Sequence, residues 1–171
     1  MKTIQLSLFI ITLLFVSCQT KKRNESKKIV LNAITDFNPV KREGIAPFYK
    51  HKKKNALAIN AVIYKNLFSA ANTVFKGKSG LYDIDLTTLK ETDGESFYKI
   101  FVNDSLLKVF QNSATEIDYE PSIFTVKNVK LKKDAVLEVQ FNSHSNLKIP
   151  ENDSFAFSRG RWTSLTLIPI E

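Results

Sequence analysis

The sequence predicts an all-β fold, a β-sandwich of eight or nine short strands, and three observations lead to it. Apolar and polar residues alternate within residues 80–110, the period of two that a strand with one solvated face produces. Turn-forming residues such as Asn103-Asp104 separate these segments, because both tolerate the left-handed conformation of a tight hairpin. Similar short segments recur at regular spacing along the chain, which is typical of a sandwich.

The N-terminal half of the predicted domain contains two segments that precede this stretch. Residues 29–37 form a candidate first strand that ends at Asn38-Pro39. Residues 55–75 show both a near-helical spacing and a strand-like alternation of apolar residues, so the pattern alone allows either structure. Asparagines within the segment are unfavourable in helix interiors, and we therefore expect two strands with a turn near Lys65-Asn66.

The remaining strands follow from residue 80 onward. We expect them at residues 80–86, 97–102, 106–110, 124–131, 136–141 and 163–170. The first three read as successive antiparallel neighbours, and the second of them is apolar on both sides, which favours a central position. A shift in the apolar alternation predicts a bulge at Lys127-Asn128. Pro169 favours an edge position for the last strand.

The N-terminal segment has the features of a lipoprotein signal peptide. Residues 1–17 begin with Lys2 and continue with an apolar run that is too short to span a bilayer. The motif Phe15-Val16-Ser17-Cys18 resembles the bacterial lipobox, in which the cysteine is acylated and becomes the new N-terminus. Acyl chains such as palmitate on Cys18 would anchor the protein to the lipid bilayer without a spanning helix. The alternative is an ordinary cleavage that leaves Cys18 as a buried thiol.

Charge is unevenly distributed along the chain. The formal net charge is +8, and residues 18–28 form a basic tether in which Gln19–Lys28 contributes five basic residues and one acidic residue. Without Lys2 and this tether, 19 basic and 16 acidic residues leave the domain at residues 29–171 with a net charge of +3. So modest a charge, without a recognised motif, argues against nucleic acid as a partner. We expect a lipid-anchored protein of the cell envelope, in the outer membrane of a diderm bacterium.

Several motifs occur in an order that resembles a known family. They are G-L-Y-D-I-D-L, a D-G-E-S turn into F-Y-K-I-F-V-N-D, V-K-L-K-K-D-A-V-L-E-V-Q-F and R-W-T-S-L-T-L, between Gly80 and Leu167. This order resembles the jelly-roll carbohydrate-binding modules of the galactose-binding-like superfamily. The resemblance implies a jelly-roll sandwich over residues 56–170 and a polysaccharide or oligosaccharide ligand. Asp104 and Asp134-Ala135 depart from the glycines of the family pattern, and both changes are compatible with turns.

The same resemblance implies a structural calcium ion, which related modules bind through acidic residues of the first and last strands. Here the first strand offers Asn32 and Asp36, whereas residues 165–170 contain no carboxylate. A second, weaker pair of oxygen ligands is Asp93 and Glu95, although their spacing is not that of an EF-hand. A solvated turn is the preferred interpretation of that pair.

Residues 142–162, most of which form a long polar loop, are the main candidate for a binding site, because binding residues concentrate in loops on rigid sandwiches. A sugar site needs planar polar groups for adjacent hydroxyls and an aromatic face for the apolar side of the ring. The candidates are Asn142, His144, Asn146, Glu151, Arg159, Arg161, Trp162, Tyr119 and Tyr49. In the alternative, preferred for Trp162, the arginines pair with carboxylates to fix the loop and the indole lies in the core.

No recognisable catalytic motif occurs in the sequence. A triad would have to combine Ser143 or Ser145 with His144 or His51, and the chain has no nucleophile elbow. We therefore expect a protein that is not an enzyme, a membrane-anchored lipoprotein that captures or presents glycan at the cell envelope. The alternative is a structural or protein-interaction lipoprotein whose partner is another envelope protein.

Overall fold

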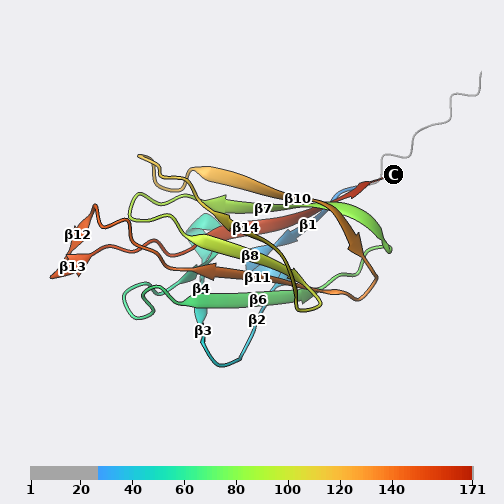
Figure 1. Ribbon diagram of the computed structural model, residues 1–171, viewed down its shortest axis with the longest axis horizontal. Helices are drawn as coiled ribbons and strands as arrows, with labels where there is room; N and C mark the ends of the chain where they lie inside the picture. Colours follow the sequence, from blue (N-terminus) through green and yellow to red (C-terminus); the bar gives the residue numbers. More distant parts are fainter. Residues whose placement is uncertain (1–26, 171) are drawn as a thin grey trace, which may run out of the picture.

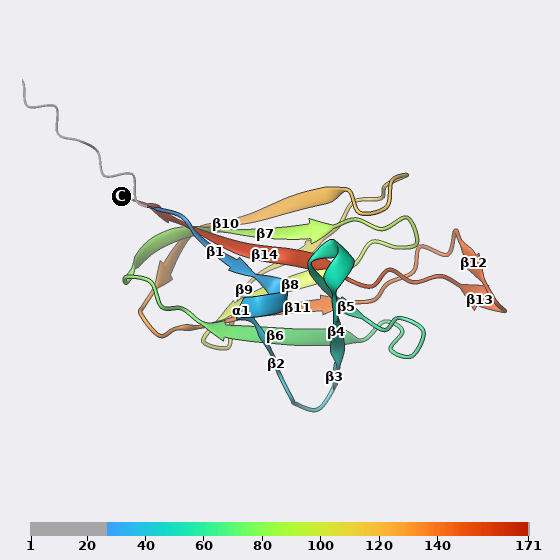
Figure 2. The same cartoon turned by 180° about the vertical axis from the view of Figure 1, so that it is seen from behind.

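The computed structural model describes residues 27–170, which form a β-sandwich of two large sheets (Figure 1, Figure 2). The predicted signal peptide, Cys18 and nearly all of the predicted tether lie outside these residues. Within residues 27–170, no helix is long and apolar enough to cross a lipid bilayer. The all-β sandwich expected from the sequence is confirmed.

The first sheet has the strand order β10-β7-β14-β5-β4, and β1 also pairs with β14. The bounds are Ile29–Asn32 for β1, Phe48–His51 for β4, Ala56–Ile59 for β5, Gly80–Leu89 for β7, Pro121–Leu131 for β10 and Trp162–Ile170 for β14. A short helix, α1 (Ala33–Asp36), follows β1, and a 3-10 turn, η1 (Lys52–Lys54), joins β4 to β5.

The second sheet has the order β2-β6-β11-β8-β9, and β3 pairs in parallel with β6. The bounds are Asn38–Pro39 for β2, Ile45–Ala46 for β3, Phe68–Val74 for β6, Phe97–Val102 for β8, Ser105–Gln111 for β9 and Val136–Asn142 for β11. A small hairpin, β12 (Pro150–Glu151) with β13 (Ser154–Phe155), projects from one end of the sandwich (Figure 1).

Local predictions about strands and turns are confirmed. Residues 55–75 form the strands β5 and β6, and Asn66 adopts a φ of 58° in the connection between them. The register of β10 against β7 shifts between Val126 and Val129, and Asn128 has a φ of 58°. Asparagine adopts this left-handed conformation at small cost, and its presence at these positions therefore predicted the turn and the bulge.

The predicted order of the central strands is wrong, because β7 and β8 lie in different sheets. The alternation along each strand shows that one face is buried, but not which layer the strand joins. Tyr82 and Ile84 of β7 and Ile100 of β8 are all buried in the core cluster between the sheets. The hairpin of β8 and β9 is as expected, with Asn103 and Asp104 both at positive φ.

The first and last strands also differ from their predictions. The first ends at Asn32, because the Asp36 carboxylate accepts the Asn32 N–H at 2.6 Å and closes the turn of α1. The last, β14, lies between β7 on one side and β1 and β5 on the other. Pro169 nevertheless fits there, since β1 reaches only as far as Leu167 and Pro169 pairs with β7 alone.

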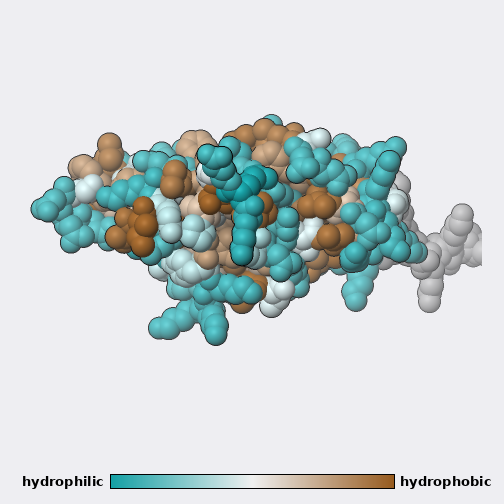
Figure 3. All heavy atoms as spheres, turned by 90° about the horizontal axis from the view of Figure 1, so that it is seen from below, coloured by the Kyte–Doolittle hydropathy of each residue, from teal (hydrophilic) through white to brown (hydrophobic). Residues whose placement is uncertain are grey.

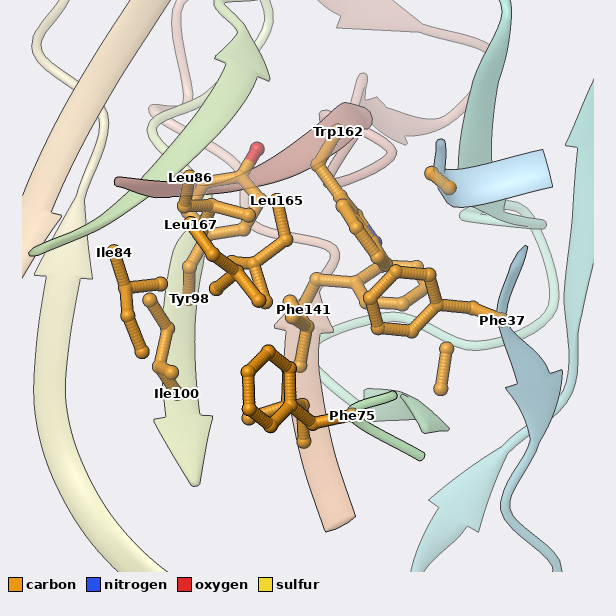
Figure 4. Close-up of a cluster of buried hydrophobic side chains, with 14 of the residues drawn as sticks. Phe37, Phe75, Ile84, Leu86, Tyr98, Ile100, Phe141, Trp162, Leu165 and Leu167 are labelled. Atoms are coloured by element: carbon orange, nitrogen blue, oxygen red, sulfur yellow. The ribbon is translucent and has the colours of Figure 1, made fainter. Parts of the chain in front are cut away.

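The core lies between the sheets, and Trp162 is its largest side chain (Figure 4). Its indole contacts the edge of Phe37 at a centroid distance of 4.8 Å and Phe141 at 6.0 Å. Because Trp162 is fully buried, its ring offers no face to a ligand, and the core interpretation of this residue is confirmed. The indole instead ties the start of β14 to the second sheet.

Candidate functional site

The edge strand β4 and the turn η1 present aromatic and basic side chains at one end of the sandwich. Alternation along β4 places Tyr49 and His51 on one face, with ring centroids 6.3 Å apart. Phe48 faces the other way and contacts Phe141 of the core. The lysines of η1 follow, and Asn55, with a φ of 51°, turns the chain into β5.

A buried carboxylate, Glu91, organises the loops at this end. It forms an ion pair with Arg161 and accepts the backbone N–H of Arg159 at 2.9 Å. Only 4% of Glu91 is exposed, so both of these partners offset its lost hydration. In the sequence, Glu91 stands out only as a neighbour of the weak cation-site candidates Asp93 and Glu95. Its burial and its two partners are what identify it as an organising residue.

Arg161 links this ion pair to His51. Its Nε donates a hydrogen bond to His51 Nδ1 at 3.2 Å, so the imidazole accepts at Nδ1 and keeps its proton on Nε2. Burial lowers the pKa of His51, and the charges of Arg161 and the nearby lysines lower it further. Burial also lowers the pKa of the Arg161 guanidinium. His51 is therefore neutral at pH 7, with its Nε2–H as a hydrogen-bond donor.

Tyr119 lies beside His51, so that Tyr49, His51 and Tyr119 form an aromatic row. Its ring centroid lies 6.5 Å from that of His51, and the Arg161 guanidinium carbon lies 5.1 Å from it. The Lys54 ammonium sits 3.8 Å from the same centroid, a close cation–π contact. Tyr119 has a φ of 69°, a strained value for a tyrosine, and its N–H bonds the carbonyl of Lys90. The loop thus holds the ring against the cations.

A groove of about 510 Å³ opens beside Tyr49. Its lining residues are Pro47, Phe48, Tyr49, Asn60, Val62, Ile63, Tyr64 and Arg159. Val62 and Ile63 are 67% and 66% exposed, so one wall is an apolar loop. In the view of Figure 3, apolar side chains form separate patches among hydrophilic ones rather than one continuous face. The groove combines two tyrosines, an amide and a guanidinium.

The structure brings only part of the predicted site together. Tyr49 and Arg159 share the groove, and Arg161 and Tyr119 lie in the adjoining aromatic row. Glu151 is exposed on β12 of the projecting hairpin. Asn142, His144 and Asn146 are instead engaged in contacts within the loops.

Asn142, His144 and Asn146 hold the chain rather than face a common surface. The Asn142 Oδ1 accepts the Phe97 N–H at 2.7 Å, and Asn142 is buried. Asn146 Nδ2 donates to the Thr92 carbonyl at 2.9 Å. The imidazole of His144 packs edge-on against Phe97 with centroids 5.5 Å apart. These planar polar side chains, which the sequence offered for sugar recognition, therefore fix the loop between β11 and β14 instead.

Neither carboxylate set forms a metal centre in the described chain. Asp93 faces Arg159 at 3.4 Å, and Glu95 accepts from Asn146 Nδ2 at 3.4 Å. The Asp36 carboxylate accepts the Asn32 N–H, and β14 carries no carboxylate to complete a calcium site. Within residues 27–170, no group of three or more His, Cys, Asp and Glu side chains could hold a metal ion. The residues thus do not fit the calcium site of the resembled family.

The serine next to His144 is also engaged elsewhere. Ser143 is buried and its hydroxyl donates to the Tyr64 carbonyl at 2.6 Å. His144 Nδ1 lies 4.0 Å from the nearest Glu95 oxygen, beyond hydrogen-bond range. The hydroxyl, imidazole and carboxylate at this loop are therefore not arranged as a nucleophilic triad.

Comparison with known proteins assigns the fold. The chain aligns at 11% identity and a TM-score of 0.57 with the CBM36-1 domain of a multidomain xylanase from the hindgut metagenome of Trinervitermes trinervoides, covering 85% of this chain and 99% of that one. A carbohydrate-binding module solved in complex with calcium and xylotriose aligns with a TM-score of 0.48 and 10% identity, over 81% of this chain and 97% of that one. The first of these two alignments shows that the protein has the jelly-roll β-sandwich fold of carbohydrate-binding modules.

One sequence relative is longer than this chain. It is the uncharacterized protein P23 of Formosa agariphila, which is 33% identical over 126 residues, or 72% of this chain. The chain spans only 28% of the length of that relative. No family profile matches the chain.

Proposed function

We propose that the protein is a non-catalytic, membrane-anchored lipoprotein that captures or presents glycan at the cell envelope. The observation that carries this proposal is the placement of Tyr49 and Arg159 in one groove. Tyr49 is 39% exposed, so its ring can stack on the apolar face of a sugar. The planar groups of Arg159 and Asn60 line the same groove, where each can bond adjacent hydroxyls.

The position of the groove suits an anchored protein. Ile29, the start of β1, pairs with Leu167 near the end of β14, and the chain leads from there toward Cys18. Trp162, at the other end of β14, pairs with Leu57 of β5, the neighbour of β4. An anchor at Cys18 would thus attach at the end of the sandwich opposite the groove, which leaves the groove facing away from the bilayer.

Glycan binding can be tested by affinity electrophoresis of the full-length protein in gels that contain polysaccharides of different backbones. Tyr49→Ala should abolish the retardation that the unmodified protein shows. Phe155→Ala is the matched control, because Phe155 is 38% exposed but lies on the projecting hairpin. The proposal would be contradicted if the Tyr49→Ala variant were still retarded. It would also be contradicted if no polysaccharide retarded the unmodified protein.

Membrane anchoring has a separate test. Mass spectrometry of the purified protein should find acyl chains on an N-terminal Cys18, and Cys18→Ala should move the protein out of the membrane fraction. An unmodified Cys18 in a protein that still sediments with membranes would reject the anchor while leaving the glycan proposal standing.

A second candidate function is a contact with another envelope protein, and one observation favours it. Val62, Ile63 and Leu67 expose apolar side chains on a single loop at the groove end. Exposed apolar patches mark interaction surfaces more often than single exposed residues do. Stoichiometric co-purification of one partner that Val62→Ser/Ile63→Ser disrupts would favour this function over glycan binding.

A further inference from the structure

We propose that the surface formed by Tyr49, His51, Tyr119 and Lys54 binds an anionic glycan, a polysaccharide that carries carboxylate or sulfate groups. The inference rests on the proposed glycan-binding function and names the class of its ligand. It starts from the side chains around His51 on β4 and Tyr119 in the loop before β10.

The side chains at this surface are dominated by cations. Arg161 contacts His51 at 3.2 Å, and Lys54 lies 3.8 Å from the centroid of Tyr119. After burial, the charges that lower the pKa of His51 are those of Arg161, Lys54, Arg159 and Lys53. Two of these four cations, Arg161 and Arg159, are paired with carboxylates, so the positive charge near His51 that is not balanced by an ion pair is that of the lysines.

Four carboxylates near this surface already have partners, and three of these partners are cations. Glu91 is paired with Arg161, and Asp93 with Arg159 at 3.4 Å. Asp118 accepts the N–H and the hydroxyl of Thr92 at 2.8 and 3.0 Å. Glu120 pairs with Lys90 at 2.8 Å. The hydrogen bonds from Thr92 leave Asp118 its negative charge, whereas the other three carboxylates are each balanced by a cation.

Lys52, Lys53 and Lys54 have no carboxylate within 4.0 Å among the described residues. Three consecutive like charges on a short turn repel one another. A bound anion would relieve this repulsion, whereas a neutral sugar would not. The domain as a whole carries a net charge of only +3, calculated from 19 basic and 16 acidic residues, so these lysines concentrate its excess.

The aromatic row and the cations are close enough to act on one ligand. A sugar ring stacked on Tyr49 would direct its equatorial substituents past the ring edge toward His51, whose Nε2–H can donate to them. Tyr119 lies on the other side of His51, and the Lys54 ammonium over its ring is the next donor. Carboxylate and sulfate both accept such charge-assisted hydrogen bonds. The surface thus selects for charge on the glycan and does not by itself distinguish the two anions.

Two matched pairs of polysaccharides test the inference with the full-length protein in detergent. Dextran sulfate is compared with dextran, and polygalacturonate with its methyl ester, so that each pair shares one backbone. We expect binding to at least one charged member, undetectable binding to its neutral counterpart, and weaker binding as salt rises from about 50 to 500 mM, because salt screens exposed charges. The pair that responds identifies sulfate or carboxylate as the recognised group.

Charge-matched variants assign the binding to the proposed residues. Lys53→Ala/Lys54→Ala should weaken binding by roughly fivefold, as expected for the loss of two exposed ion pairs. Lys132→Ala/Lys133→Ala changes the net charge equally in the turn between β10 and β11, at the opposite end of the sandwich, and should leave affinity unchanged. Equal melting temperatures would show that the variants are folded.

Three results would overturn the inference. Binding to neutral glycans with no salt dependence would do so while sustaining the glycan-binding function. Equal weakening by both double variants would place the binding outside this surface. Binding to DNA or polyphosphate as strong as to the charged glycans would show recognition of charge without sugar. Failure to bind any glycan would instead reject the proposed function itself.

Discussion

The carboxylate of Glu91, near the start of the loop that leaves β7, lies against the guanidinium of Arg161, the residue that precedes β14. The two side chains are 3% and 5% exposed, so the pair is shielded from water. Glu91 also accepts the Arg159 N–H, and Arg161 also bonds His51. One buried ion pair therefore sets the position of both the β14 entry and the edge strand β4.

Replacement of the carboxylate tests this role. Glu91→Gln should lower the free energy of unfolding by about 3 kcal/mol, because it leaves the buried guanidinium without a counter-charge. Urea unfolding followed by the emission of Trp162 measures the loss. Glu120→Gln, which removes an exposed pair with Lys90, is the control and should barely change the midpoint. Similar losses in both variants would show that Glu91 has no special structural role.

Alanine substitutions at two glycines distinguish the stability cost of a strained backbone conformation from the cost of steric overlap. Gly44 and Gly160 both have positive φ, of 75° and 57°, but only at Gly160 would an added Cβ overlap the Asn142 carbonyl. Gly44→Ala should cost about 1 kcal/mol of stability and Gly160→Ala about 3 kcal/mol. Thermal unfolding of the two variants provides the comparison. Equal costs would mean that the loop before β14 moves freely away from β11.

The lowered pKa of His51 makes stability depend on pH. An unfolded imidazole takes up its proton near pH 6.5, whereas the folded one does so only at lower pH. The unfolded state therefore binds more protons in this window, and stability should fall as the pH drops below 6.5. His51→Asn keeps an acceptor for Arg161 and should remove this part of the dependence. Identical pH profiles for both proteins, measured by urea unfolding, would contradict the assignment.

Local chemistry explains the turns that the sequence predicted correctly. Asn66, Asn103 and Asn128 all adopt positive φ, and each was expected at a turn or bulge because its short polar side chain permits that conformation. The positions of Tyr49 and Arg159 in one groove could not be predicted in the same way. They are 110 residues apart and meet because β5 and β14 pair at Leu57 and Trp162.

By itself, the sequence determined where the chain extends and where it turns, since alternation and the asparagine positions act over a few residues. The tertiary structure alone decided that β7 and β8 belong to opposite layers, that Trp162 is enclosed and that Arg161 faces Glu91. The reason is physical: a strand's pattern records that one face avoids water, whereas the layer and the partner depend on which distant segments bury that face.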